Sequence, residues 1–124
     1  MNKVILIGRL TKNPELKSTT SGKSVLQFTL AETQRYGNGK ETTSYHNIVV
    51  WEGKAETIAK YCKQGDQIII EGSLRYRDYN DRSGNKKSIT EILVESFEFG
   101  AKKQIEGDPF DHPAENISWD ELPF

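Results

Sequence analysis

The feature that most constrains the fold is a two-residue hydrophobic period that recurs through the first hundred residues. In residues 24–36, Leu26, Phe28 and Leu30 alternate with Val25, Gln27 and Thr29, which is typical of a β-strand with one buried face. Similar alternation, or a dense run of β-branched residues and leucine, predicts four further strands at residues 2–10, 42–51, 66–79 and 87–99. Glycine-rich turns are expected at residues 37–40 and 81–85.

One segment breaks this period and predicts a helix. In residues 54–63, four small or apolar side chains recur at helical spacing: Ala55, Ile58, Ala59 and Cys62. Gly65 follows at a position suited to a helix C-cap. Because Cys62 belongs to the apolar stripe, we expect a core residue and not a reactive thiol. A single cysteine also excludes an internal disulfide framework.

The order of these elements is strand, strand, strand, helix, strand, strand. A helix between the third and fourth of five strands is the order of the OB-fold, an all-β Greek-key barrel that binds oligonucleotides or oligosaccharides. We therefore predict an OB-fold domain over residues 1–100. After Gly100 the hydrophobic period stops, so residues 101–116 are predicted to form a flexible acidic linker, and residues 117–124 a separate C-terminal peptide.

Charge divides the chain at a similar place. Residues 105–124 contain six acidic side chains and no Lys or Arg, which leaves 12 of the 18 acidic residues against all 17 Lys and Arg residues in positions 1–104. A basic body with an acidic tail indicates two functional units, although a tail that only keeps the chain soluble fits equally well. No apolar run is long enough for a membrane helix and no signal-peptide cleavage site is evident, so a cytoplasmic location without membrane contact is expected.

Aromatic and basic side chains are interleaved on the predicted strands and turns. Tyr45 and Trp51 share one face of the third strand. On the fourth strand and in the two turns the same mixture recurs, at Arg75, Arg77, Tyr79, Arg82, Lys86, Lys87, Arg35 and Tyr36. Single-stranded nucleic acid needs this combination, because rings stack on bases while cations follow phosphates. The alternative is that the rings only suit strands and the cations only face water.

Three segments carry a family resemblance: NKVILIGRL with Pro14-Glu15 after it, YHNIVVW, and IIIEGSLRYRDYNDRSG. Over almost its whole length the chain resembles bacterial and phage single-stranded DNA-binding proteins. The resemblance implies an OB-fold, usually a homotetramer, that coats single-stranded DNA without sequence preference. It places Tyr36, Tyr45 and Tyr79 where the family has stacking tryptophans, Trp51 at a stacking phenylalanine position, and His46 near a subunit interface. Tyr36 has the parity of Leu30, so a bulge or strand end must turn it outward.

The resemblance extends to the chain's last residues, Trp119, Asp120, Glu121, Leu122, Pro123 and Phe124. In the family such a peptide recruits replication, recombination and repair enzymes. The Phe124 ring can fill an apolar pocket on a partner protein while its α-carboxylate meets a basic residue there. The nearby acids are attracted to a basic rim around such a pocket. Pro123 restricts the backbone and so lowers the entropy lost on docking. A second hypothesis is that this acidic tail occupies the chain's own basic groove until DNA displaces it.

Two other functions are alternatives for this sequence. A metal-dependent nuclease would need Asp78, Asp81 or the tail carboxylates, but His46 and His112 are far apart and no metal-ligand spacing, phosphate-cradling loop or nucleophile–base pair is present. We therefore expect no enzyme, no cofactor and no metal. An OB-fold adaptor for a protein or a structured RNA predicts selective binding and little loss when Trp51 is replaced by alanine.

Overall fold

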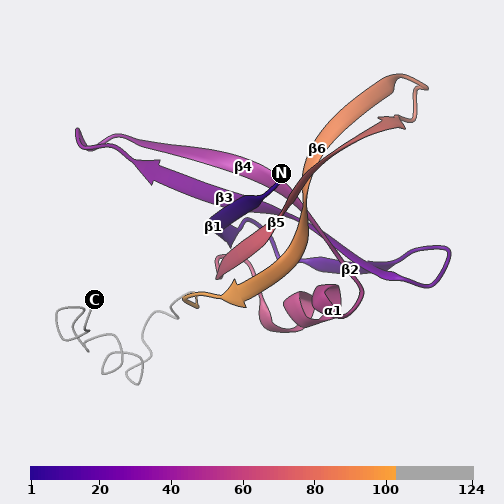
Figure 1. Cartoon of the computed structure of the whole chain (residues 1–124), viewed down its shortest axis with the longest axis horizontal. Coiled ribbons are helices and arrows are strands. Elements are labelled where there is room, and N and C mark those ends of the chain that lie inside the picture. Colours follow the sequence, from indigo (N-terminus) through magenta and orange to yellow (C-terminus); the bar gives the residue numbers. More distant parts are fainter. Residues whose placement is uncertain (103–124) are drawn as a thin grey trace.

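The computed structural model describes residues 1–102, which form one β-sheet closed into a barrel, with one short helix (Figure 1). The predicted linker beyond Lys102 and the C-terminal peptide lie outside the described residues. In chain order the elements are β1 (Val4–Leu10), β2 (Glu15–Ser18), β3 (Ser24–Arg35), β4 (Glu41–Trp51), α1 (Glu52–Tyr61), β5 (Gln67–Asn80) and β6 (Lys86–Phe99). No helix in this part of the chain is long and apolar enough to cross a membrane.

Five of the strands close the barrel in the order β1-β5-β6-β4-β3. The closure is made where the end of β1 pairs antiparallel with β3, with Leu10 opposite Leu30. One contact is parallel, between β4 and β6, where Ile48 lies opposite Ile92. A five-stranded barrel with a helix between its third and fourth strands is the OB-fold architecture, so the fold prediction is confirmed.

A sixth strand, β2, was not predicted. It pairs with β3 alone, outside the closed barrel, and continues into a hairpin whose turn joins Thr19 to Lys23. All four residues of β2 are exposed. Since no side chain of β2 enters the core, the segment shows none of the hydrophobic alternation by which a strand is found in sequence.

The core lies inside the barrel and beneath α1. The alternating apolar positions of the strands point inward, and the largest fully buried side chains are Leu26, Leu30, Ile48, Ile58, Ile68, Ile70, Val50 and Cys62. Helix α1 packs on β3 and adds Ala55 and Ile58 to the same cluster. Cys62 is buried as predicted, and the loss of water around it raises the pKa of its thiol, which keeps the group protonated and apolar.

The helix begins and ends two residues earlier than predicted, and the role expected of Gly65 is wrong. The backbone is already extended at Cys62, whose N–H donates to the Ile58 carbonyl at 2.9 Å. Gly65 has a positive φ of 88°, but it lies in a separate turn in which the Asp66 N–H donates to the Lys63 carbonyl. That turn leads the chain directly into β5.

A β-bulge interrupts the pairing of β5 with β6, where Glu95 of β6 has no partner on β5. The pairing of β5 with β6 shifts between Glu71 and Gly72. At Gly72 the two backbones approach so closely that a Cβ atom would lie 2.0 Å from the Leu93 carbonyl oxygen. A bulge bends a strand and increases its twist. Beyond this point β5 and β6 project from the barrel as a long hairpin, opposite the hairpin formed by β3 and β4 (Figure 1).

Candidate nucleic-acid interface

One face of β4 continues across three neighbouring strands. Side chains opposite one another in a sheet share a face. Val25 of β3 lies opposite Trp51, and Val49 lies opposite Leu93 of β6. The same face reaches β5 because Arg75 lies opposite Glu91. We call this surface the outer sheet face; its members are Val25, Gln27, Thr29, Tyr45, Asn47, Val49, Trp51, Leu93, Glu91, Arg75, Arg77 and Tyr79.

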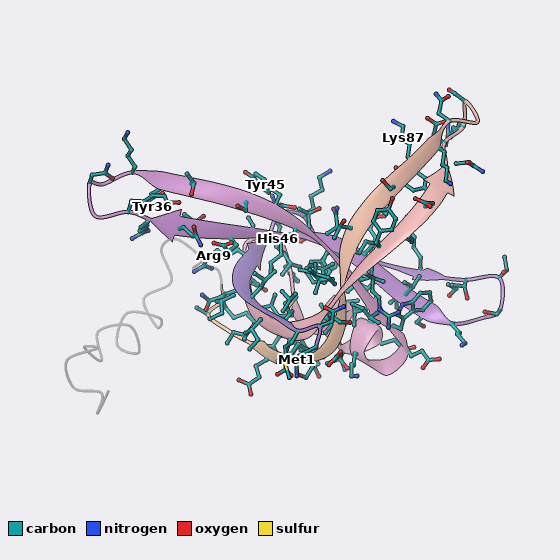
Figure 2. All side chains as sticks on the ribbon, turned by 45° about the horizontal axis from the view of Figure 1, so that its top comes forward. Met1, Arg9, Tyr36, Tyr45, His46 and Lys87 are labelled. Atoms are coloured by element: carbon teal, nitrogen blue, oxygen red, sulfur yellow. The ribbon has the colours of Figure 1, made fainter. Side chains whose placement is uncertain are left out.

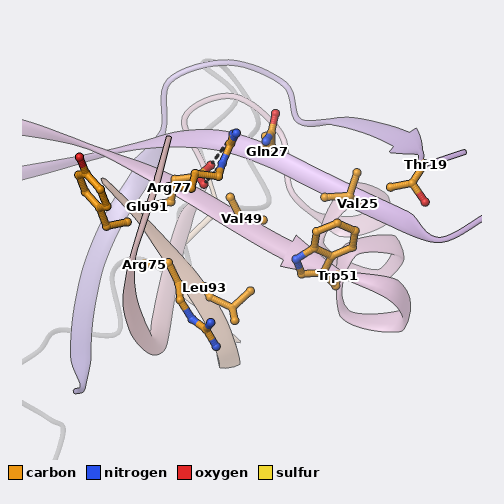
Figure 3. A pocket seen from close by; sticks show the side chains of 10 residues that line it. Thr19, Val25, Gln27, Val49, Trp51, Arg75, Arg77, Glu91 and Leu93 are labelled. Atoms are coloured by element: carbon orange, nitrogen blue, oxygen red, sulfur yellow. Dashed lines mark hydrogen bonds and ion pairs between the residues drawn. The ribbon is translucent and has the colours of Figure 1, made fainter. Parts of the chain in front are cut away.

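The outer sheet face is hollowed into a groove with a volume of about 590 Å³. Val25, Val49 and Leu93 supply apolar surface within it, and Trp51 and Arg75 are also among the lining residues (Figure 3). Small apolar side chains between a ring and a guanidinium can accommodate a flat, partly apolar group such as a nucleobase.

Three of the four aromatic residues predicted to stack lie on this face, outside the core. The exposed fraction is 67% for Tyr45 and 41% for both Trp51 and Tyr79. Tyr45 lies near the middle of the β4 face and Trp51 at the end of the strand, whereas Tyr79 lies on the β5–β6 hairpin. The rings therefore present surface to solvent along different parts of the outer sheet face.

Tyr36 lies apart from this groove, at the far end of the β3–β4 hairpin (Figure 2). It follows the last residue of β3 and is exposed, with its hydroxyl 3.4 Å from the Gln34 and Thr42 side-chain oxygens. The hairpin projects beyond the barrel, so neither of its faces covers the core at this end. The parity that Tyr36 shares with Leu30 therefore does not bury it.

Most of the predicted phosphate-binding cations lie at exposed hairpin ends. Arg35 pairs with Glu41 at 3.0 Å at the end of the β3–β4 hairpin. At the end of the β5–β6 hairpin, Lys86 and Lys87 lie 3.8 and 4.0 Å from Asp78 and Asp81. Exposed pairs of this kind contribute about 0–1 kcal/mol, so a phosphate can compete for each cation. Within residues 1–102, Arg75 and Arg82 form no ion pair.

Arg77 differs from the other cations because its partner is buried. Its Nε donates to Glu91 Oε1 at 2.6 Å, and a second guanidinium nitrogen lies 3.4 Å from Oε2. Glu91 is only 6% exposed. The hydrogen bond that Arg77 donates to Glu91 raises the pKa of Arg77 above its ordinary value. Glu91 was not among the predicted site residues. Its position between Ile89 and Leu93 on one strand face is a signal for a buried acid that needs a basic partner.

Two of the acids named for the nuclease alternative have partners at the end of the β5–β6 hairpin. Asp81 accepts hydrogen bonds from the backbone N–H groups of Ser83 and Asn85, both at 2.9 Å. Asp78 lies beside Lys86. Across the described part of the chain, no group of three or more His, Cys, Asp or Glu side chains is placed to hold a metal ion.

His46 faces the opposite side of β4 from Tyr45. It is partly buried where the β3–β4 hairpin leaves the barrel, with Nε2 at 3.4 Å from Glu32 Oε1. The side-chain contact that His46 makes in the described chain is thus with Glu32 of β3, and its expected place at a subunit interface stays a prediction.

A closed barrel with exposed rings and basic hairpins on one sheet face defines an OB-fold binding domain. Comparison with protein families makes the assignment specific: the chain belongs to the single-strand binding protein family, whose model matches residues 1–100. The match covers the whole barrel and ends where the hydrophobic period of the sequence ends.

Individual relatives agree with this family. The single-stranded DNA-binding protein of Bacillus cereus is 41% identical over 101 residues, which cover 80% of this chain and 59% of that protein. Single-stranded DNA-binding protein 1 of Chlorobaculum tepidum is 43% identical over 108 residues, covering 82% and 67%. The chain thus spans about three fifths of the length of the Bacillus relative. Single-stranded DNA-binding protein 1 of Lactococcus lactis is 32% identical and aligns over 100% of this chain and 99% of its own.

Proposed function

We propose that this protein binds and protects single-stranded DNA without sequence preference during replication, recombination and repair, and that it does so without catalysis. The observation that carries the proposal is the outer sheet face, where Trp51 lines a groove and Tyr45 and Tyr79 are exposed on the same face. The family to which the chain belongs and the printed names of its relatives support the same function. A cytoplasmic, nucleoid-associated location follows from this role.

Binding by this face explains tolerance of any base sequence. A ring stacks on the flat face of every base and contributes about 1–3 kcal/mol per base, while Lys and Arg attract phosphates irrespective of sequence. Paired bases offer no such faces, and a duplex is usually read by a helix or ribbon that enters a groove. Helix α1 is short and packs its apolar side on β3. Single strands should therefore bind far better than duplex.

Titration of labelled oligo(dT) by fluorescence anisotropy, at two salt concentrations, tests this proposal. The logarithm of the affinity should fall with the logarithm of salt concentration, with a slope of about −0.7 per phosphate neutralised. A mixed-sequence strand of the same length should bind similarly, and a hairpin duplex much more weakly. Equal affinity for the duplex would contradict the proposal, and strong selectivity for one sequence or one folded RNA would favour the adaptor function.

We further propose that the chain assembles as a homotetramer. Ile5 and Ile7 of β1 are exposed on the outside of the barrel, and Leu74 and Tyr76 are exposed on β5. Ile5 and Ile7 share one face of β1, and exposed apolar side chains of this kind favour contact with another protein surface. Light scattering coupled to size-exclusion chromatography should give a mass of about four times the 14.1 kDa chain. Replacing Ile5 and Ile7 with lysine should lower that mass; a wild-type monomer at micromolar concentration would refute the assembly.

We propose that residues 117–124 recruit replication, recombination and repair proteins through Phe124 and the acids before it. The chemistry of these residues supports the proposal, since an apolar ring beside carboxylates suits an apolar pocket with a basic rim. The variant Phe124→Ala should coat single-stranded DNA as well as wild type but no longer retain such enzymes on a DNA resin. If the acidic tail also competes for the outer sheet face, deletion of residues 117–124 should raise DNA affinity at low salt. An unchanged affinity would exclude that competition.

A further inference from the structure

Arg77 and Glu91 form an ion pair within the groove of the outer sheet face, not at its basic hairpin ends. Both side chains line the groove, and Figure 3 shows the guanidinium directed at the carboxylate. Two guanidinium nitrogens face the two Glu91 oxygens, at 2.6 and 3.4 Å. A two-point contact fixes the plane of a guanidinium as well as its position.

The pair is close to neutral as a unit. Glu91 is almost fully buried, and a buried carboxylate without a partner is costly, so Arg77 is strongly held to it. The lysines at the hairpin end lie 3.8 and 4.0 Å from Asp78 and Asp81, and water weakens these long contacts of exposed lysines, so each lysine is easily released. Arg77 is therefore poorly suited to neutralise a phosphate.

The fixed guanidinium lies beside an aromatic ring. The Cζ atom of Arg77 is 5.7 Å from the ring centroid of Tyr79, two residues further along the same strand face. Guanidinium planes, like aromatic rings, stack on nucleobases. Half of the Arg77 side chain remains exposed although Glu91 holds it.

We infer that Glu91 positions Arg77 as a flat base-stacking surface that extends Tyr79, so that bases face the centre of the groove and phosphates face its rim. This inference rests on the proposed binding of single-stranded DNA. Arg77 contacts the bases directly, and Glu91 acts through Arg77. Arg75 lies on the same strand face and has no ion pair in the described chain. Its charge is therefore free to contact a phosphate, in contrast to that of Arg77.

Salt-dependent titration of oligo(dT) separates these roles. Arg77→Lys keeps the charge but loses the plane, so affinity should fall about five- to tenfold with an unchanged salt slope. The double variant Arg77→Gln/Glu91→Gln removes both charges and should also weaken binding without changing the slope. The matched control Arg75→Gln should make the slope shallower by about 0.7. Thermal melting of each variant verifies that it is folded.

A further variant tests the positioning role of Glu91. Glu91→Gln leaves the Arg77 charge uncancelled, so the salt slope should become steeper by up to about 0.7. Full affinity in Arg77→Lys, a shallower slope in the double variant, or an unchanged slope in Glu91→Gln would each overturn the inference. Each of these results still requires that wild type binds oligo(dT). Failure of wild type to bind would instead refute the proposed function.

Discussion

Replacing Trp51 and Tyr79 together with alanine is expected to lower the affinity for single-stranded DNA by roughly 30-fold to 10⁴-fold, from about 1–3 kcal/mol per lost ring. Both rings lie on the outer sheet face, and neither belongs to the buried cluster inside the barrel. The double variant should therefore keep its fold, as judged by circular dichroism and thermal melting. Anisotropy titration with oligo(dT) at moderate salt measures the loss.

Tyr61→Ala is the matched control for this experiment. Tyr61 is 50% exposed, similar to the two stacking candidates, but it lies on α1 and packs edge-on against Phe99 at the end of β6. Its replacement should leave the DNA affinity within about twofold of wild type, because it offers no ring to the outer sheet face. If the Trp51 and Tyr79 double variant bound single-stranded DNA as tightly as Tyr61→Ala, the OB-fold adaptor function would explain the protein better than base stacking.

Gly72→Ala is expected to destabilise the protein by about 3 kcal/mol or more, at the upper end of what overpacking usually costs. The added Cβ would lie 2.0 Å from the Leu93 carbonyl oxygen, which is a backbone atom of the paired strand and cannot rotate away. For a domain of this size, such a change lowers Tm by more than about 12 °C. Thermal or urea unfolding followed by circular dichroism measures it.

The same substitution at Gly53 should have the opposite sign. Gly53 lies in the first turn of α1, its φ is not positive, and nothing lies within 4 Å of the Cβ that alanine would add. Alanine there should stabilise the protein by about 0.5–1 kcal/mol, because it limits the unfolded chain and favours the helix. Wild-type stability in Gly72→Ala would show that the bulge is not constrained by the close approach of the two strands.

Most of the barrel could be predicted because the core imposes its period on the sequence. Leu26 and Leu30 are fully buried, as are Ile68 and Ile70, and each pair is spaced as strand positions that face one core. The helix was found for the same reason, since Ala55 and Ile58 have to meet the core at helical spacing. Positions that are buried at a fixed interval are therefore the easiest structural feature to predict from a single sequence.

Features without burial, or with conformations set by a neighbouring strand, could not be predicted. β2 is wholly exposed and so has no hydrophobic period. The early start of α1 depends on Glu52, a residue other than glycine with a positive φ of 59°, which no propensity favours. The predicted continuous strand is present as β5, but the bulge beside it depends on the register against β6, where Glu95 has no partner on β5, and the pattern of one strand does not record that register.

The candidate site divides in the same way. Alternation along single strands was enough to place Tyr45 with Trp51 and Arg77 with Tyr79, because those relations lie within one strand. The pairing of Arg77 with Glu91 joins two strands, 14 residues apart in sequence, and depends on their register. The sequence therefore identified Arg77 as a cation but not the partner that cancels its charge.

The most direct test of the central claim uses the intrinsic fluorescence of Trp51. The chain has two tryptophans, so Trp119→Phe leaves Trp51 as the single tryptophan, whose emission is followed with excitation that tyrosine does not absorb. If bases stack on the outer sheet face, oligo(dT) should quench this emission to saturation, at the same concentrations at which anisotropy reports binding, and added salt should restore it. Binding seen by anisotropy with no change in Trp51 emission would contradict the account.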